Sequence, residues 1–322
     1  MKHGKKTFVI IEAVLGILVI LVLGFIIYKQ NGHDPETIAV IIPDVDESEW
    51  SAFKYGLKMA AREYDTDVVI ISKDNMETAN DEIEIMNQEI AKGADAVIVK
   101  PIANRDGQQK LKQLEKSVPI MAVGDTFPEE PSGLHTIESD HYHMGADLAQ
   151  KLLENYRGNL IGKKIGIYSQ HATSEAVIKR MKGICDTLKG SGAEILWSVS
   201  KENDSKEKIN LQTQRRVDIV MALDNASFVE AGEAAKDNDL YGAGLYGIGN
   251  STEAVYYLDA GWAQCLVAPD EFDAGYESVA ELIKKRHNFF YKMKDRQITY
   301  TVLTRENLFS EENRNLLFTI SR

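Results

Sequence analysis

Short apolar runs alternate with helix-like segments along most of this chain, and the alternation restarts near its middle. The first series of runs covers residues 38–42, 67–72, 94–99 and 119–123, and the second covers 164–168, 194–197, 218–222 and 244–248. Helices are expected between them, at 80–92, 108–116, 141–156, 175–189, 207–215 and 227–238. Such alternation is typical of parallel strands that are covered on both faces. The sequence therefore predicts an α/β protein with two doubly wound parallel-sheet lobes and a ligand cleft between them.

The loop after the first apolar run carries the residues that most suggest binding. Ligands of open α/β sheets lie just outside the carboxyl ends of the strands. At that place the sequence has four carboxylates and one large aromatic side chain: Asp44, Asp46, Glu47, Glu49 and Trp50. For any one of them, a solvated loop whose Trp fills the core is an equally good interpretation. As a group they favour a site that binds a polar ring.

An apolar run at residues 7–28 predicts a membrane anchor. As a helix it would span roughly 33 Å, which is enough for a bilayer core of about 30 Å. A cleaved signal peptide is the alternative, but it would have a shorter apolar region followed by a small-residue cleavage site, and residues 28–33 offer none. Three lysines precede the run and one follows it closely, so the N-terminus is expected in the cytoplasm. We expect a cytoplasmic tail at 1–6, a transmembrane helix at 7–28, a linker at 29–36 and an extracytoplasmic remainder.

Composition limits the partners of that remainder. The chain has a net charge of −12, and residues 1–30 are net positive, so the part outside the membrane is more acidic still. Such a surface repels nucleic acid, which excludes DNA and RNA as partners. The only cysteines are Cys185 and Cys265, on an expected helix and an expected strand. We expect two buried free thiols, although the location would permit a disulfide.

Short motifs in a fixed order along the chain carry a family resemblance. They are Pro43-Asp44 with Trp50, the segments 92–101 and 118–125, Ser139-Asp140 with Gly145, and the segments 180–183 and 259–261. In this order they resemble the type I periplasmic binding proteins, the ribose- and galactose-binding group whose fold also forms the core of lactose-type repressors. The resemblance covers about residues 37–310. It implies a non-enzymatic binding protein that closes two lobes on a small polar ligand, most often a sugar; a repressor would need a helix-turn-helix where this chain has its apolar run.

The resemblance also implies individual roles in the cleft. Trp50 would stack on a sugar ring, Asp125 would bind hydroxyl groups at the end of the fourth strand, and Arg180 would reach in from the second lobe. A carboxylate and a guanidinium can each bind two adjacent hydroxyls. Asp224 and Asn250 are further candidates at strand ends. The chain departs from the usual pattern at Thr126, Gly249-Asn250 and Pro269, which argues against ribose as the ligand.

The same resemblance implies how the lobes are divided. The N-lobe would comprise residues 37–139, completed by about 269–294, and the C-lobe 140–268, completed by about 295–310, with a tail at 311–322. The chain would cross between lobes near 138–140, near 268–269 and near the segment 288–295. Three adjacent crossings permit a hinge rotation, and Pro269 should stiffen the middle one because its φ is fixed.

Two alternatives and two weak motifs complete the sequence evidence. A type II membrane glycosyltransferase would share the anchor and the α/β body, with Asp44 and Asp46 holding a divalent metal. Within the binding-protein interpretation, the partner could be an ABC permease or a membrane sensor histidine kinase. The segment 242–247 matches GxGxxG, but it follows a helix and enters a strand, so it does not predict a dinucleotide site. His141 and His143 are too few for a metal site, and no cofactor is expected.

Overall fold

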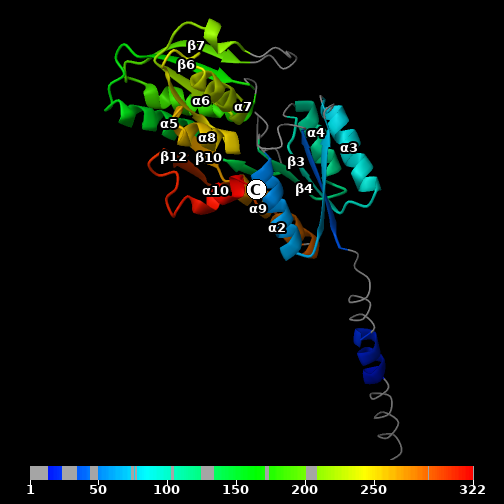
Figure 1. Ribbon diagram of the computed structural model, residues 1–322. Helices are drawn as coiled ribbons and strands as arrows, with labels where there is room; N and C mark the ends of the chain where they lie inside the picture. The colour runs from blue at the N-terminus through cyan, green and yellow to red at the C-terminus, as the bar shows by residue number, and fades with distance from the viewer. Residues whose placement is uncertain are drawn as a thin grey trace, which may run out of the picture. The chain divides into compact units, whose positions relative to one another are not determined.

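The computed structural model describes residues 14–23, 35–43, 50–73, 76, 78–102, 105–124, 134–170, 174–200, 209–288 and 290–321. The chain divides into two compact units, residues 1–36 and 37–322 (Figure 1). In the first unit, residues 14–23 form a helix whose side chains are all exposed. Within the described residues, no helix has both the length and the apolar character needed to cross a membrane. The expected anchor at 7–28 lies only partly within these residues, so it stays a prediction.

The second unit contains two six-stranded sheets, and the first of them forms the N-lobe. Its strand order is β11-β5-β4-β3-β1-β2, and the described pairings in it are parallel. The strands are β1 (Thr37–Pro43), β2 (Asp67–Lys73), β3 (Ala96–Val99), β4 (Ile120–Val123), β5 (His135–Ser139) and β11 (Arg296–Ile298). The helices that cover it are α2 (Ser51–Glu63), α3 (Ala79–Ala91), α4 (Arg105–Leu114) and α9 (Glu271–His287).

The second sheet forms the C-lobe in the order β12-β10-β9-β8-β6-β7. Its strands are β6 (Lys164–Ser169), β7 (Glu194–Ser200), β8 (Ile219–Ala222), β9 (Gly244–Ile248), β10 (Ala263–Pro269) and β12 (Tyr300–Leu303). Only the pairing of β12 with β10 is antiparallel among those described in this sheet. Its helices are α5 (His141–Asn155), α6 (Glu175–Leu188), α7 (Asn225–Lys236), α8 (Thr252–Asp259) and α10 (Arg314–Ile320). The prediction of two parallel-sheet α/β lobes is confirmed.

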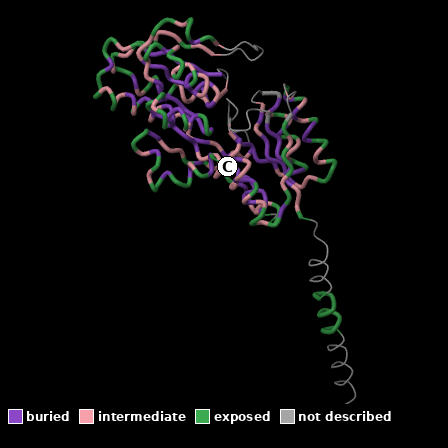
Figure 2. Tube along the Cα trace, viewed as in Figure 1, coloured by how far each residue is buried: buried purple, intermediate pink, exposed green. Residues whose placement is uncertain are grey.

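The apolar runs form strands because both faces of each sheet are covered. In β1, Ile38, Val40 and Ile42 belong to a core shared with α2 and α9, whereas Ala39 and Ile41 belong to a core shared with α3 and α4. Figure 2 shows this burial along the strands of both lobes. Continuous burial on both faces explains why these strands lack the alternation of a half-exposed sheet.

Two local predictions are wrong. In place of the helix expected at 207–215, the described part of that segment forms only a 3-10 turn, Leu211–Thr213. Asn210 caps that turn with its side chain, which competes with a longer helix. Both cysteines are free, but only Cys265 is buried, and Cys185 is exposed. Cys185 lies on the outer side of α6, because Ile184 and Leu188 of that helix face the core.

The chain crosses between the lobes at three neighbouring places. The first crossing follows Ser139 of β5, the second follows Pro269 of β10, and the third lies at Thr299, between β11 and β12. The backbone N–H of Asp270 donates to the carbonyl of Thr299 at 3.0 Å, which joins the second and third crossings. The third crossing lies beyond the expected segment 288–295, because β11 adds its three residues to the N-lobe sheet first.

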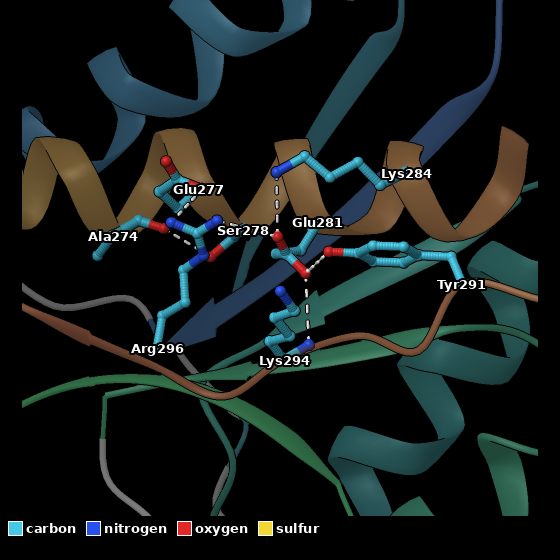
Figure 3. A network of polar contacts seen from close by, with 8 residues as sticks. All are labelled: Ala274, Glu277, Ser278, Glu281, Lys284, Tyr291, Lys294 and Arg296. Carbon is cyan, nitrogen blue, oxygen red and sulfur yellow. Dashed lines mark hydrogen bonds and ion pairs between the residues drawn. The ribbon is translucent and has the colours of Figure 1, made fainter. Parts of the chain in front are cut away.

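A buried carboxylate fixes the segment that leads into the third crossing. Glu281 of α9 is inaccessible to solvent. It accepts hydrogen bonds from the hydroxyl of Tyr291 at 2.8 Å and the backbone N–H of Lys294 at 3.3 Å, and it pairs with Lys284 and Arg296 (Figure 3). Although burial raises the pKa of Glu281, the bonds from Tyr291 and Lys284 outweigh it and hold the pKa below its ordinary value. The carboxylate therefore stays ionised and positions β11.

Glycines allow one close helix pair in each lobe. A methyl group on Gly56 of α2 would lie 2.0 Å from the carbonyl oxygen of Phe272 in α9. In the C-lobe, a methyl group on Gly145 of α5 would lie 2.0 Å from the carbonyl oxygen of Arg180 in α6. The backbones thus touch directly, which places Arg180 against the first turns of α5.

Candidate functional site

The carboxyl ends of both sheets meet at the three crossings. Strands β5, β10 and β11 each lead into a crossing from their carboxyl ends, and Tyr300 at the start of β12 pairs with Pro269 at the end of β10. The loops at these ends belong to the edge where ligands of α/β sheets bind. The candidate site is therefore the set of strand-end residues on the two lobes.

Matching caps hold the first two crossings. Asp140 accepts from the backbone N–H of His143 at 3.0 Å and caps α5, and Asp270 accepts from the N–H of Asp273 at 3.1 Å and caps α9. Burial raises the pKa of Asp270. Burial acts in the same direction at Asp140, but the hydrogen bonds from His143 outweigh it and lower the pKa of Asp140. The caps fix the direction in which each helix leaves its crossing.

On the N-lobe, Trp50 is the expected site residue that the structure describes. Asp44, Asp46, Glu47, Glu49 and Asp125 lie outside the described residues, and their roles stay predictions. Trp50 directly precedes α2, is 6 % exposed, and meets Phe53 edge-on with ring centres 5.4 Å apart. Its indole nitrogen is buried and has no hydrogen-bond partner in the described part of the chain. The ammonium of Lys100 lies 5.0 Å from the centre of the Trp50 ring.

On the C-lobe, Arg180 lies where α6 passes the end of β8. Its guanidinium donates to the carbonyl of Leu223 at 2.7 Å and to Nδ1 of His141 at 3.2 Å. His141 is the first residue of α5, so Arg180 lies beside the first crossing. One residue earlier, Lys179 pairs with Glu138 of β5 at 3.7 Å. The guanidinium is thus held at the carboxyl edge of the C-lobe sheet, next to the first crossing.

The other two C-lobe candidates take part in the loop structure. Asp224 caps α7 by accepting from the N–H of Ser227 at 2.8 Å, and its other oxygen accepts from the N–H of Gln170 at 2.8 Å. Asn250 is buried, and its backbone N–H donates to the side-chain oxygen of Asn225 at 3.0 Å. These bonds connect the loops after β6, β8 and β9, so that the strand ends of the C-lobe form one polar surface.

Two groups at these edges are not among the predicted site residues, although one of them, Lys100, lies in the motif segment 92–101. At the end of β6, the amide of Gln170 donates to the hydroxyl of Tyr168 at 2.8 Å and to the carboxylate of Glu230 at 2.7 Å. Tyr168 also bonds directly to Glu230, and burial together with this bond raises the pKa of its hydroxyl. Lys100, at the end of β3, is the second group. Gln170 and Lys100 each directly follow a buried strand, and this position is the signal that could have identified them from the sequence.

Two cavities lie away from these strand ends. One, of about 1030 Å³, is at the amino ends of the C-lobe strands and is lined by Lys163, Asp218 and Gly244 among others. The second, of about 510 Å³, lies between α8 and α10. Among the described residues, no group of three or more His, Cys, Asp or Glu side chains is arranged to hold a metal ion.

A family model described as "Periplasmic binding protein domain" matches residues 38–285. The chain belongs to the periplasmic binding protein family. This family match gives no support to the glycosyltransferase alternative. A comparison with curated proteins found no match.

Solved solute- and sugar-binding proteins share the fold of this chain. A carbohydrate transporter solute-binding protein from Agrobacterium radiobacter, in complex with D-arabinose, is 16% identical, with a TM-score of 0.77 over 89% of this chain and 100% of that one. A glucose-galactose binding protein from Geobacillus stearothermophilus is 15% identical, with a TM-score of 0.73 over 86% and 100%. A periplasmic solute-binding protein from Actinobacillus succinogenes with bound D-allose is 17% identical, with a TM-score of 0.73 over 84% and 98%. At these identities the likeness establishes the fold.

Proposed function

We propose that this periplasmic binding protein closes its two lobes on a sugar, without covalent chemistry. The observation that carries the proposal is the meeting of both carboxyl edges at three crossings, with an aromatic ring on one lobe and a held guanidinium on the other. Trp50 would supply an apolar surface for a sugar ring, although its side chain is 6 % exposed and belongs to the N-lobe core, and Arg180 would supply donors for the hydroxyls. The sugars named for the similar structures agree with this assignment.

The closed form would be favoured by the ligand alone. A sugar that contacts both lobes binds the closed arrangement more tightly than the open one, and this difference in affinity shifts the equilibrium. Asp125 on the N-lobe, with Asp224 and Asn250 on the C-lobe, would complete the hydrogen bonding. The acidic residues 44–49 would border the ligand where the first strand ends.

Calorimetry of the 37–322 unit with a panel of pentoses and hexoses tests the proposal. Arg180→Ala should weaken the binding of the best sugar by roughly ten- to a hundredfold, because a hydrogen bond to a charged group contributes about 1.5–3 kcal/mol. Lys189→Ala, at the far end of α6, is the matched control and should leave the affinity unchanged. Unchanged affinity of a folded Arg180→Ala protein would remove the C-lobe half of the site.

We further propose that residues 7–28 anchor the protein in the cell membrane, with the binding unit outside the cytoplasm. The helix over residues 14–23 supports this, because it exposes apolar side chains such as Leu18, Ile20 and Leu21 that water would not favour. The partner would be an ABC permease, or a sensor histidine kinase that reads the closed form. The full chain should stay with membranes through carbonate washing, and a chain that lacks residues 1–30 should not; release of the full chain would contradict the anchor.

A further inference from the structure

Strand β2 lies at an outer edge of the N-lobe sheet, and no described strand pairs with its free side. Its seven residues have the sequence DVVIISK. Two of its apolar side chains are open to solvent, since Val69 is 45 % exposed and Ile70 is 38 % exposed. An edge strand also presents backbone N–H and C=O groups to any chain that can pair with them. β2 therefore offers hydrogen-bonding groups and apolar side chains together.

The rest of β2 is held firmly in the lobe. Val68 packs against the core that α2 and α9 share, and Ile71 packs against the core that α3 and α4 share. The parallel register of β2 with β1 runs without a shift along the whole length of both strands. Because its backbone is regular and its position is fixed from both faces, β2 is a preformed template for a further strand.

The other three sheet edges are protected in ways that β2 lacks. Strand β11, at the opposite edge of the N-lobe sheet, has three residues and begins with Arg296. In the C-lobe, β12 has four residues, and the register of β7 with β6 shifts between Ile165 and Gly166. Short edges, charged residues and irregular pairing all discourage the addition of a strand. Between its two end residues β2 carries no charge and no proline, so its edge stays open to a partner.

The sequence of β2 is complementary to itself when two copies run antiparallel. The strand begins with an acidic residue, Asp67, and ends with a basic one, Lys73. A two-fold axis through Ile70 brings the acidic end of each strand beside the basic end of the other. In this register Val69 lies opposite Ile71 of the second copy, and the two Ile70 residues lie opposite each other. Residues of a strand alternate in the side to which their backbone groups point, so a register centred on a residue pairs outward-pointing groups with each other.

We propose that β2 binds β2 of a second copy of this chain as an antiparallel pair, which joins the two N-lobe sheets into one. The β-branched side chains of Val69, Ile70 and Ile71 would cover one another across the pair. The assembly is closed at two copies, because both contribute the same strand. The three lobe crossings follow β5, β10 and β11, away from β2 in the strand order, so the pairing does not involve them. The inference is independent of the sugar.

Sedimentation of the full-length protein in detergent tests the pairing. Between about 1 and about 100 µM the protein should pass from monomer to dimer. Ile70→Lys should weaken the dimer by about tenfold or more, because it places two positive charges opposite each other. Ile161→Lys is the matched control, since this isoleucine is 78 % exposed in a turn of the C-lobe, and it should leave the dimer unchanged. Thermal unfolding of both variants would confirm that they are folded.

Cysteine cross-linking tests the register. The experiment uses a Cys185→Ser background, because that thiol is exposed. Ile70→Cys should form a disulfide-linked dimer on mild oxidation, since the two Cα atoms would lie about 5 Å apart. Ser72→Cys, an exposed position on the same face of the strand, is the control. Its two copies would lie about four residues apart along the pair, roughly 14 Å, and should not cross-link.

Three results would overturn the inference. A wild-type protein that is monomeric at every concentration would leave the edge of β2 to a strand of a different protein. A dimer that Ile70→Lys does not weaken would be held by another part of the chain, such as the apolar segment 7–28. Equal cross-linking of Ile70→Cys and Ser72→Cys would contradict the antiparallel register. None of these results bears on sugar binding, which calorimetry tests separately.

Discussion

The carboxylate of Glu281 and the hydroxyl of Tyr291 are 2.8 Å apart, and their hydrogen bond joins helix α9 to the segment that leads into the third lobe crossing. Lys284 and Arg296 surround the same carboxylate from two sides. The carboxylate itself is closed to solvent, whereas Lys284 and Arg296 are half-buried, and the ion pairs and hydrogen bonds together hold β11 against β5.

Glu281→Gln should destabilise the N-lobe by up to about 3 kcal/mol, since it removes the buried negative charge that the half-buried Lys284 and Arg296 surround, while Arg296 keeps its ion pair with Glu277. Because the folded pKa of Glu281 is below its ordinary value, its contribution is present above that ordinary value and is lost as the pH falls through the folded pKa. Urea unfolding at pH 7 and at pH 3.5 would measure this. Tyr291→Phe is the milder control, expected to lose about 1.5–3 kcal/mol. Equal stability of wild type and Glu281→Gln at pH 7 would contradict the assignment.

Glu82 is a second carboxylate without solvent access, and it should behave in the opposite way. One oxygen accepts from Ile102, and the other has no partner in the described part of the chain. Burial raises its pKa to about 7, against the lowering effect of the Ile102 bond. Between the ordinary value and about 7 the folded state binds the proton that the unfolded state has lost, so stability should fall as the pH rises through this window.

The free energy of unfolding should fall by up to about 3 kcal/mol, at about 1.4 kcal/mol for each pH unit in this window. Glu82→Gln should remove most of this pH dependence. Unfolding midpoints of the two proteins at pH 5, 6, 7 and 8 would decide it. Parallel curves for wild type and variant would show that Glu82 does not titrate in this range.

The sequence predicts the central strands well and the edges of the lobes poorly. Runs such as 38–42 are apolar throughout because both sheet faces are covered, and this is visible without a structure. By contrast, β11 has the polar sequence Arg-Gln-Ile, and it is held by contacts with Glu281 and β5 that are distant in sequence. For this reason the third crossing lies at Thr299, past the end of the segment 288–295 near which it is predicted.

Individual candidate site residues show the same limit. The place of Arg180 beside the crossing is predictable from the motif that contains it, whereas its partners, Leu223 and His141, come from other elements. Lys100 does not stand out in the sequence because a lysine after a strand is usually solvated, and only the fold brings it over Trp50. The prediction that Cys185 is buried is wrong, because it rests on the general preference of free cysteines for buried positions and not on a repeat of apolar residues along the helix.

Helix α10 should resist rotation of the lobes, because it connects them outside the three crossings. Its Leu316 and Ile320 pack in the C-lobe core. The carbonyl of Ile320 accepts from Ser51 of α2 at 3.2 Å and from Thr252 of α8 at 3.4 Å. The ring of Phe318 lies 6.3 Å from that of Tyr55 on α2. A rotation about the crossings would shift α2 relative to this helix.

Phe318→Ala should therefore raise the affinity for sugar by about two- to fivefold, which corresponds to an aromatic contact of about 0.5–1 kcal/mol. Phe309→Ala changes a more exposed ring in the same tail and should leave the affinity unchanged. A fall in affinity for Phe318→Ala at unchanged stability would mean that the contact favours the closed form instead.

Small-angle scattering of the 37–322 unit, with and without the sugar that calorimetry identifies as the tightest ligand, tests the central claim most directly. Closure of two lobes about three crossings predicts a smaller radius of gyration at saturating sugar. Nuclear magnetic resonance of the same samples should show the sugar chemically unchanged. A scattering curve that saturating sugar does not alter, or a sugar converted to product, would contradict the account.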